Sequence, residues 1–122
     1  MKLHEGKALN KLIFKFQVAF NGLFEGLAHD FSIRIQFVFA MLAIIIAFLF
    51  KFTYIEWSIW LLCIAIVISL EYLNSSMEQM MDRLDPRYHV LTKKAKDLGA
   101  ASVLVSALVS LIIGMIFVFN HL

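Results

Sequence analysis

The sequence predicts an all-α integral membrane protein with an N-terminal amphipathic surface helix and three transmembrane helices. Of its 122 residues, 61% are hydrophobic and only 16% are charged, whereas a soluble domain of this size carries more charge and fewer apolar residues. Three long apolar runs follow a polar and basic N-terminal stretch. We therefore expect residues 1–122 to form a single membrane domain.

Residues 8–28 show the spacing of an amphipathic helix. Apolar residues recur every three or four positions, and polar residues such as Lys11 and Glu25 occupy much of the opposite face. This pattern is typical of a helix that lies in the interface on the inner leaflet of a membrane. A helix packed inside a bundle shows a similar stripe, so that alternative stays open.

Three helices with transmembrane spans are expected at residues 33–50, 55–84 and 93–119. The dipeptide Asp85-Pro86 should end the second of them, because the residue before a proline avoids helical geometry. The third helix carries a small residue at every fourth position, which allows helices to approach closely in lipid. These small residues are Ser102, Ser106, Ser110 and Gly114.

The basic residues are unevenly distributed. Most of them precede the first apolar run or lie between the second and third runs, and the short loop between the first two runs holds only Lys51. The positive-inside rule then places the N-terminus and the second loop in the cytoplasm. After an odd number of spans, the C-terminus lies on the outer side.

A polar stripe on the second spanning helix is the most informative feature of the chain. Glu71, Asn74, Glu78 and Asp82 fall within about 60–80° of one another around a helix axis. Only fourteen uncharged residues precede Glu71 after Glu56, and a span needs about 20 apolar residues. Glu71 is therefore expected inside the bilayer or at its inner edge. Ionisable groups there are costly and are retained mainly where they face a protein interior or a polar cavity.

Several kinds of site are absent from the sequence. It has no phosphate-cradling glycine loop, no histidine pair with zinc spacing and a lone cysteine. Carboxylates remain, and their oxygens suit Mg²⁺ or can act as a general base. A plain alternative for Asp82 is a helix-end carboxylate paired with a basic residue, and this alternative is weaker for Glu71. Asn74 can also serve simply to bridge helices.

At these residues the chain resembles the prokaryotic diacylglycerol kinase family, whose members are small trimeric membrane lipid kinases. The resemblance extends roughly over residues 10–119. Its motifs are Glu71-x-x-Asn74-Ser75-Ser76-Met77-Glu78-x-x-x-Asp82-Arg83, then Tyr88-His89, then Ala95-Lys96-Asp97-x-Gly99-Ala100-Ala101. The Asp85-Pro86 turn and Glu56-Trp57 are more similar to the Gram-positive branch, whose members resemble undecaprenol kinases.

The resemblance implies transfer of the γ-phosphoryl group of ATP to the hydroxyl of a membrane lipid, with undecaprenol favoured over diacylglycerol. Glu71 matches the catalytic base, which also contacts the lipid, and Arg34 matches a substrate-binding position. Asp30 and Glu78 match the Mg²⁺ ligands, although the family usually has the longer Glu where Asp30 stands. The nucleotide-binding positions are Lys11, Asp30, Asn74, Glu78, Tyr88, His89, Lys96 and Asp97.

The implied setting is a homotrimer that spans the bacterial cytoplasmic membrane several times and binds ATP and a lipid alcohol, but no nucleic acid. Two alternatives are a diacylglycerol kinase that makes phosphatidic acid and a non-enzymatic assembly protein that uses the stripe for helix association. The continuation of the stripe toward Lys96 and Asp97 favours a kinase, because association does not need three carboxylates.

Overall fold

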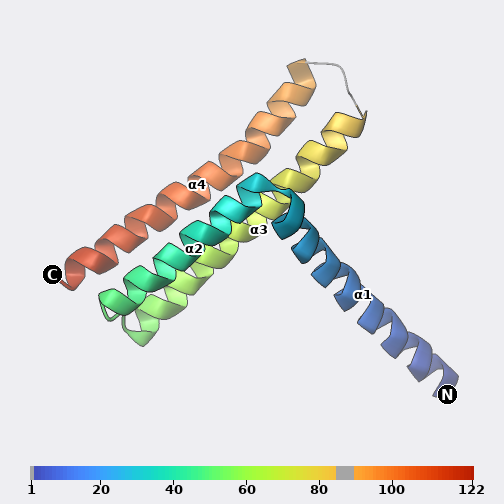
Figure 1. Cartoon of the computed structure of the whole chain (residues 1–122), viewed down its shortest axis with the longest axis horizontal. Coiled ribbons are helices and arrows are strands. Elements are labelled where there is room, and N and C mark those ends of the chain that lie inside the picture. Colours follow the sequence, from blue (N-terminus) through green and yellow to red (C-terminus); the bar gives the residue numbers. More distant parts are fainter. Residues whose placement is uncertain (1, 85–89) are drawn as a thin grey trace.

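The computed structural model describes residues 2–84 and 90–122, and these residues form four helices. They are α1 (Lys2–His29), α2 (Phe31–Leu49), α3 (Tyr54–Leu84) and α4 (Val90–Asn120). Helices α2, α3 and α4 lie side by side, and α1 projects away from them (Figure 1). Each of the three bundled helices is long and apolar enough to cross a membrane. The predicted architecture of one N-terminal helix and three spans is confirmed.

All four helices begin earlier than predicted. The largest differences are at α1, which includes Lys2 where residue 8 was expected, and at α4, which includes Val90 where residue 93 was expected. Helices α2 and α3 begin two residues and one residue early, at Phe31 and Tyr54. No glycine or proline lies between Val90 and Lys94, and lysine is a good helix former, so nothing delays the start of α4. The predicted Asp85-Pro86 turn lies outside the described residues, as do Tyr88 and His89.

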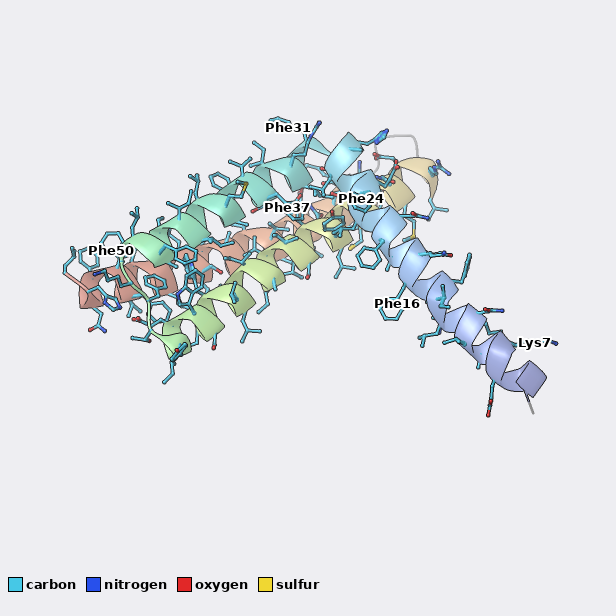
Figure 2. The ribbon with its side chains drawn as sticks, turned by 60° about the horizontal axis from the view of Figure 1, so that its bottom comes forward. Lys7, Phe16, Phe24, Phe31, Phe37 and Phe50 are labelled. Carbon is cyan, nitrogen blue, oxygen red and sulfur yellow. The ribbon has the colours of Figure 1, made fainter. Side chains whose placement is uncertain are left out.

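Helix α1 leaves the bundle at a joint with α3. The Tyr72 hydroxyl donates a hydrogen bond of 2.6 Å to the carbonyl of Leu23, and the Tyr72 ring occupies the space that a β-carbon on Gly26 would need. Apolar side chains such as Phe16 and Phe24 stay exposed along the projecting helix (Figure 2). In this chain α1 is thus not packed inside the bundle, and its exposed apolar residues suit a membrane surface.

Helix α4 approaches α3 closely where the small-residue repeat predicts it. The Trp60 ring of α3 sits 2.6 Å from the place of a β-carbon on Gly114, so only glycine leaves room for the indole. The Trp60 Nε1–H donates a hydrogen bond of 2.8 Å to the carbonyl of Ala43 in α2. This one side chain therefore links all three bundled helices.

The end of the bundle where α2 turns into α3, called the hairpin end here, has its own network. Glu56 Oε1 accepts a 2.9 Å hydrogen bond from the backbone N–H of Thr53, whose hydroxyl accepts one from the N–H of Glu56 in return. This is the reciprocal pattern of a capping box, and it starts α3. The same Glu56 oxygen lies 2.6 Å from His121 Nε2, and the His121 ring stacks on Phe52. The C-terminal end of α4 is thereby fastened to the hairpin.

Candidate functional site

The buried face of α3 changes from apolar to polar at Glu71. Trp60, Cys63 and Val67 lie on this face in the hairpin half, and Glu71 and Asn74 continue it one and two turns further on. Glu71 is only 6% exposed. Its carboxylate is hydrogen-bonded to Gln36 of α2 and feels the charges of Asp30 and Glu78.

Glu71 has no ion pair within the described part of the chain. A buried carboxylate in a structural role is normally matched by a cation or several donors. Among the described residues, the amide of Gln36 is the side-chain partner of Glu71, and the charges that act on it are the carboxylates of Asp30 and Glu78. This environment does not stabilise the protein, so it points to a chemical role.

Asn74 carries an incomplete set of hydrogen bonds. Its Nδ2 donates to Glu78 Oε1 at 3.5 Å, whereas its Oδ1 is buried and has no partner among the described residues. This oxygen faces Gly99 of α4, where a β-carbon would come within 2.5 Å of it. A buried acceptor without a donor costs free energy, which a bound ligand would recover.

Four other charged residues of α3 and α4 form two ion pairs in the described part of the chain. Lys96 Nζ pairs with Asp82 Oδ1 across the two helices, and Glu78 lies near enough to act on the Lys96 charge. Within α4, Lys93 Nζ lies 2.6 Å from Asp97 Oδ2. The structure therefore brings Lys96 beside the polar stripe, and the basic partner of Asp82 comes from α4.

Of the predicted site residues in the N-terminal third of the chain, some lie near Glu71 and others lie far from it. Asp30 caps α2, with its Oδ1 accepting a 3.1 Å hydrogen bond from the N–H of Ile33, and its charge reaches Glu71. Arg34 is exposed one turn further on. Lys11 lies nineteen residues before Asp30 on the projecting α1, which is about 28 Å along a helix axis. This chain alone does not bring Lys11 to Glu71.

A cavity with both apolar and polar walls lies in the angle between α1 and α3. Its volume is about 640 Å³, and Asp30 lies on its wall. The α3 side supplies Ser69, Tyr72, Ser76 and Gln79. These side chains stand beside the stripe and were not singled out from the sequence, because hydroxyl and amide groups near a helix end are common on any surface. The cavity gives space for polar groups next to the Glu71 region.

The donors present fit Mg²⁺ in the form it takes with nucleotides. No group of three or more His, Cys, Asp or Glu side chains in the described residues could hold an ion by itself. Mg²⁺ commonly takes one or two carboxylates and completes its shell with water and substrate phosphates. Asp30 and Glu78 can supply the carboxylates, and the unpaired Asn74 oxygen adds a neutral donor.

Comparison with known proteins identifies the family of the chain. The prokaryotic diacylglycerol kinase family matches residues 17–118. The chain is 34% identical over 108 residues to the undecaprenol kinase of Bacillus subtilis, and the match covers 88% of both chains. It is 30% identical over 103 residues to the diacylglycerol kinase of Escherichia coli K12, with 84% of both chains covered.

The family match covers enough of the chain to decide between a lipid kinase and a non-enzymatic assembly protein. It spans the projecting helix from residue 17, all three spanning helices and the residues of the polar stripe. A non-enzymatic assembly protein, which the polar stripe alone left open, is set aside. The chain therefore belongs to the prokaryotic diacylglycerol kinase family and is a multi-pass membrane lipid kinase.

Proposed function

We propose that this lipid kinase transfers the γ-phosphoryl group of ATP to undecaprenol, with Glu71 as the general base. The observation that carries the proposal is the buried Glu71 carboxylate, which has no cation partner among residues 2–84 and 90–122 and ends an apolar helix face. The choice of undecaprenol is supported by the Bacillus subtilis relative and by the Glu56-Trp57 pair. Diacylglycerol is the second candidate, because other relatives are named for it.

The chemistry needs one proton acceptor at the lipid hydroxyl. Glu71 takes the hydroxyl proton while the hydroxyl oxygen forms a bond to the γ-phosphorus of ATP. The bond between that phosphorus and the bridging oxygen breaks, ADP leaves with the bonding electrons, and the lipid becomes a monophosphate. Because no cation of the described residues pairs with Glu71, its oxygens are available for this proton. Gln36 holds the carboxylate in place.

The nucleotide would lie toward the α3–α4 end of the stripe. Asn74 and Glu78 point into this region, and Lys96 can exchange its contact with Asp82 for a phosphate oxygen. Phosphoryl transfer depends mainly on positioning and charge neutralisation, which these side chains can supply without a glycine loop. Mg²⁺ bound with ATP, held by Asp30 and Glu78, would neutralise charge on the phosphates.

The working protein is proposed to be a homotrimer formed from a single 122-residue membrane domain. The position of Lys11, about 28 Å from Asp30 along α1, supports a site that a second copy completes. The distribution of basic residues supports a cytoplasmic N-terminus and an external C-terminus. A C-terminal reporter found in the cytoplasm would contradict this orientation.

The direct test is a transfer assay with purified protein in detergent micelles. ATP labelled on its γ-phosphate and Mg²⁺ are supplied with undecaprenol, with diacylglycerol, or with both in competition. We expect the label mainly in undecaprenyl phosphate. Label only in phosphatidic acid would establish the diacylglycerol alternative, and label in neither lipid would overturn the proposed function.

A further inference from the structure

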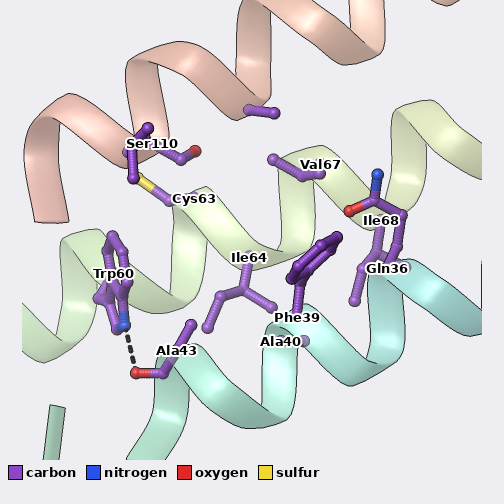
Figure 3. Close-up of a pocket in the computed structure, with 12 residues that line it drawn as sticks. Gln36, Phe39, Ala40, Ala43, Trp60, Cys63, Ile64, Val67, Ile68 and Ser110 are labelled. Carbon is purple, nitrogen blue, oxygen red and sulfur yellow. Dashed lines mark hydrogen bonds between the residues drawn. The ribbon is translucent and has the colours of Figure 1, made fainter. Parts of the chain in front are cut away.

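A second cavity lies inside the apolar part of the bundle, between α2, α3 and α4 (Figure 3). Its volume is about 330 Å³, and it is partly open to the surroundings of the bundle. Trp60 stands at one end, Gln36 and Ile68 stand at the other, and Phe39 and Ile64 lie between them. Apart from Gln36, its walls are made almost wholly of hydrocarbon and aromatic groups, with Ser110 and Cys63 as the exceptions. This cavity is called the tail groove below.

The tail groove leads to the Glu71 carboxylate. Gln36, at its polar end, is the side chain that hydrogen-bonds to Glu71. Val67 lines the groove and precedes Glu71 by one turn on the same buried face of α3. From Glu71 to Trp60 the helix rises about 16 Å. A molecule with a hydroxyl at Glu71 would therefore place its next atoms in this groove.

Trp60 closes the end of the groove that lies away from Gln36, and its ring is held in one position. Trp60 is anchored by its hydrogen bond to the Ala43 carbonyl, and Gly114 leaves room for its ring. At about 30 Å³ for a group the size of a water molecule, the groove holds roughly ten methylene-sized groups, or about two isoprene units. A longer chain has to leave through the open side into the lipid.

We propose that the tail groove binds the isoprene units next to the hydroxyl of the lipid alcohol and thereby selects an isoprenoid over a diacylglycerol. This inference rests on the proposed function. In an isoprenoid alcohol, hydrocarbon begins directly after the hydroxyl-bearing carbon, as the groove does after Gln36. In diacylglycerol, ester groups follow instead, and they would enter a region whose walls offer few hydrogen-bond donors. Polar groups buried without partners are costly.

Filling the groove should remove its contribution to binding. Ala107 of α4 lines it, so Ala107→Phe places a ring where the second isoprene unit lies. Ala65 is the matched control, because it lies between Cys63 and Val67 in α3 but on the exposed side. Substrates are prenol, geraniol and farnesol, which have one, two and three isoprene units.

We expect kcat/KM of the unaltered protein to rise at least about tenfold from prenol to geraniol, because each buried methylene adds favourable transfer free energy. In Ala107→Phe this rise should be less than about twofold, with the KM for ATP unchanged. Ala65→Phe should behave like the unaltered protein. An equal rise in Ala107→Phe would overturn the groove while leaving the proposed function intact. A change in particle size in Ala107→Phe would instead show that the groove receives another copy of the chain.

A labelling experiment on the unaltered protein does not depend on the folding of a variant or on turnover. Geraniol carrying a photoreactive diazirine at its far end should attach to the segment from Trp60 to Ile68. Excess undecaprenol should prevent the labelling, and excess diacylglycerol should not. Attachment only to lipid-exposed faces, or equal protection by both lipids, would contradict the inference. Failure of both lipids in the transfer assay would count against the proposed function alone.

Discussion

Glu56 and Glu71 are two glutamates of the same helix, α3, and they are 7% and 6% exposed. At the hairpin end, Glu56 accepts a hydrogen bond from the Thr53 N–H and lies 2.6 Å from His121 Nε2. At the other end of the span, Glu71 has Gln36 as its partner and further carboxylates nearby. Burial is the same, and the partners differ. The lack of a cation partner among the described residues, more than the exposed fraction, marks Glu71 as the carboxylate available for chemistry.

The same contrast extends to the surroundings of each glutamate. The hairpin end is closed by a cluster of Ala47, Phe52, Trp60 and Cys63, and its buried Glu56 is paired with Thr53 and His121. Around the stripe, the Asn74 Oδ1 is unpaired and a cavity of about 640 Å³ adjoins Asp30. At the hairpin end, the buried glutamate has its partners within the chain. At the polar stripe, buried polar atoms lack hydrogen-bond partners among the described residues, and a substrate can provide them. Substitutions at the polar stripe and at the hairpin end should therefore have different effects on turnover and on stability.

The largest effect is expected for Glu71→Gln, which keeps the shape of the side chain but removes the base. We expect kcat to fall by about 10²- to 10⁴-fold, while the affinity for a non-hydrolysable ATP analogue stays within about twofold. Transfer of labelled phosphate and equilibrium dialysis measure the two quantities. Glu56→Gln is the control and should retain turnover. Parallel loss of turnover and nucleotide affinity would remove Glu71 from the role of base.

A smaller effect is expected for Glu78→Ala, because a proposed Mg²⁺ ligand is lost and the base remains. The Mg²⁺ concentration for half-maximal turnover should rise by more than about tenfold. The measurement is a magnesium titration of turnover at saturating ATP. An unaltered midpoint would exclude Glu78 from the metal site. Glu5→Ala, which removes an exposed carboxylate in the first turn of α1, should leave the titration unchanged.

A still smaller effect is expected for Asp82→Asn. The Asp82–Lys96 pair is largely exposed, and such pairs contribute little. The KM for ATP should therefore change by less than about fivefold. Steady-state kinetics over a range of ATP concentrations would show it. A loss of turnover approaching that of Glu71→Gln would place Asp82 inside the reacting site, contrary to its position here.

The smallest effect on turnover is expected for His121→Ala, since this residue belongs to the hairpin end of the bundle. Its loss leaves the Glu56 carboxylate with the Thr53 N–H but without the imidazole, and it removes the ring that stacks on Phe52. The thermal midpoint should fall by about 3–8 °C, with kcat within about twofold. Thermal unfolding and a transfer assay on the same sample provide both values. Normal stability with impaired turnover would contradict the structural role.

Hydropathy and charge predicted the spans and the polar stripe, because both depend on residues close together in the chain. Contacts across long separations were not predictable in this way. The Glu56–His121 contact joins residues from opposite ends of two helices, and a histidine near a terminus gives no signal of a partner. Likewise, the Gln36–Glu71 contact needs the packing of α2 on α3.

The exact starts of the helices and the partners of individual side chains were also hard to predict from the sequence. The sequence predicted that the last helix begins at residue 93, but the residues just before it are compatible with a helix, and α4 already includes Val90. The partner of Asp82 was expected among nearby basic residues, and the structure supplies Lys96 from the neighbouring helix. The tail groove depends on three helices at once, so the sequence showed only apolar residues there.

We assign Glu71 to catalysis and Glu56 to the stability of the fold. The most direct test compares the thermal midpoint of unfolding of Glu71→Gln with that of Glu56→Gln. Replacing Glu71 removes a buried charge that has no cation partner and lies near other carboxylates. The predicted midpoint is therefore equal to or above that of the unaltered protein, whereas Glu56→Gln lowers it. A midpoint for Glu71→Gln that falls as far as that of Glu56→Gln, with turnover retained, would contradict this division.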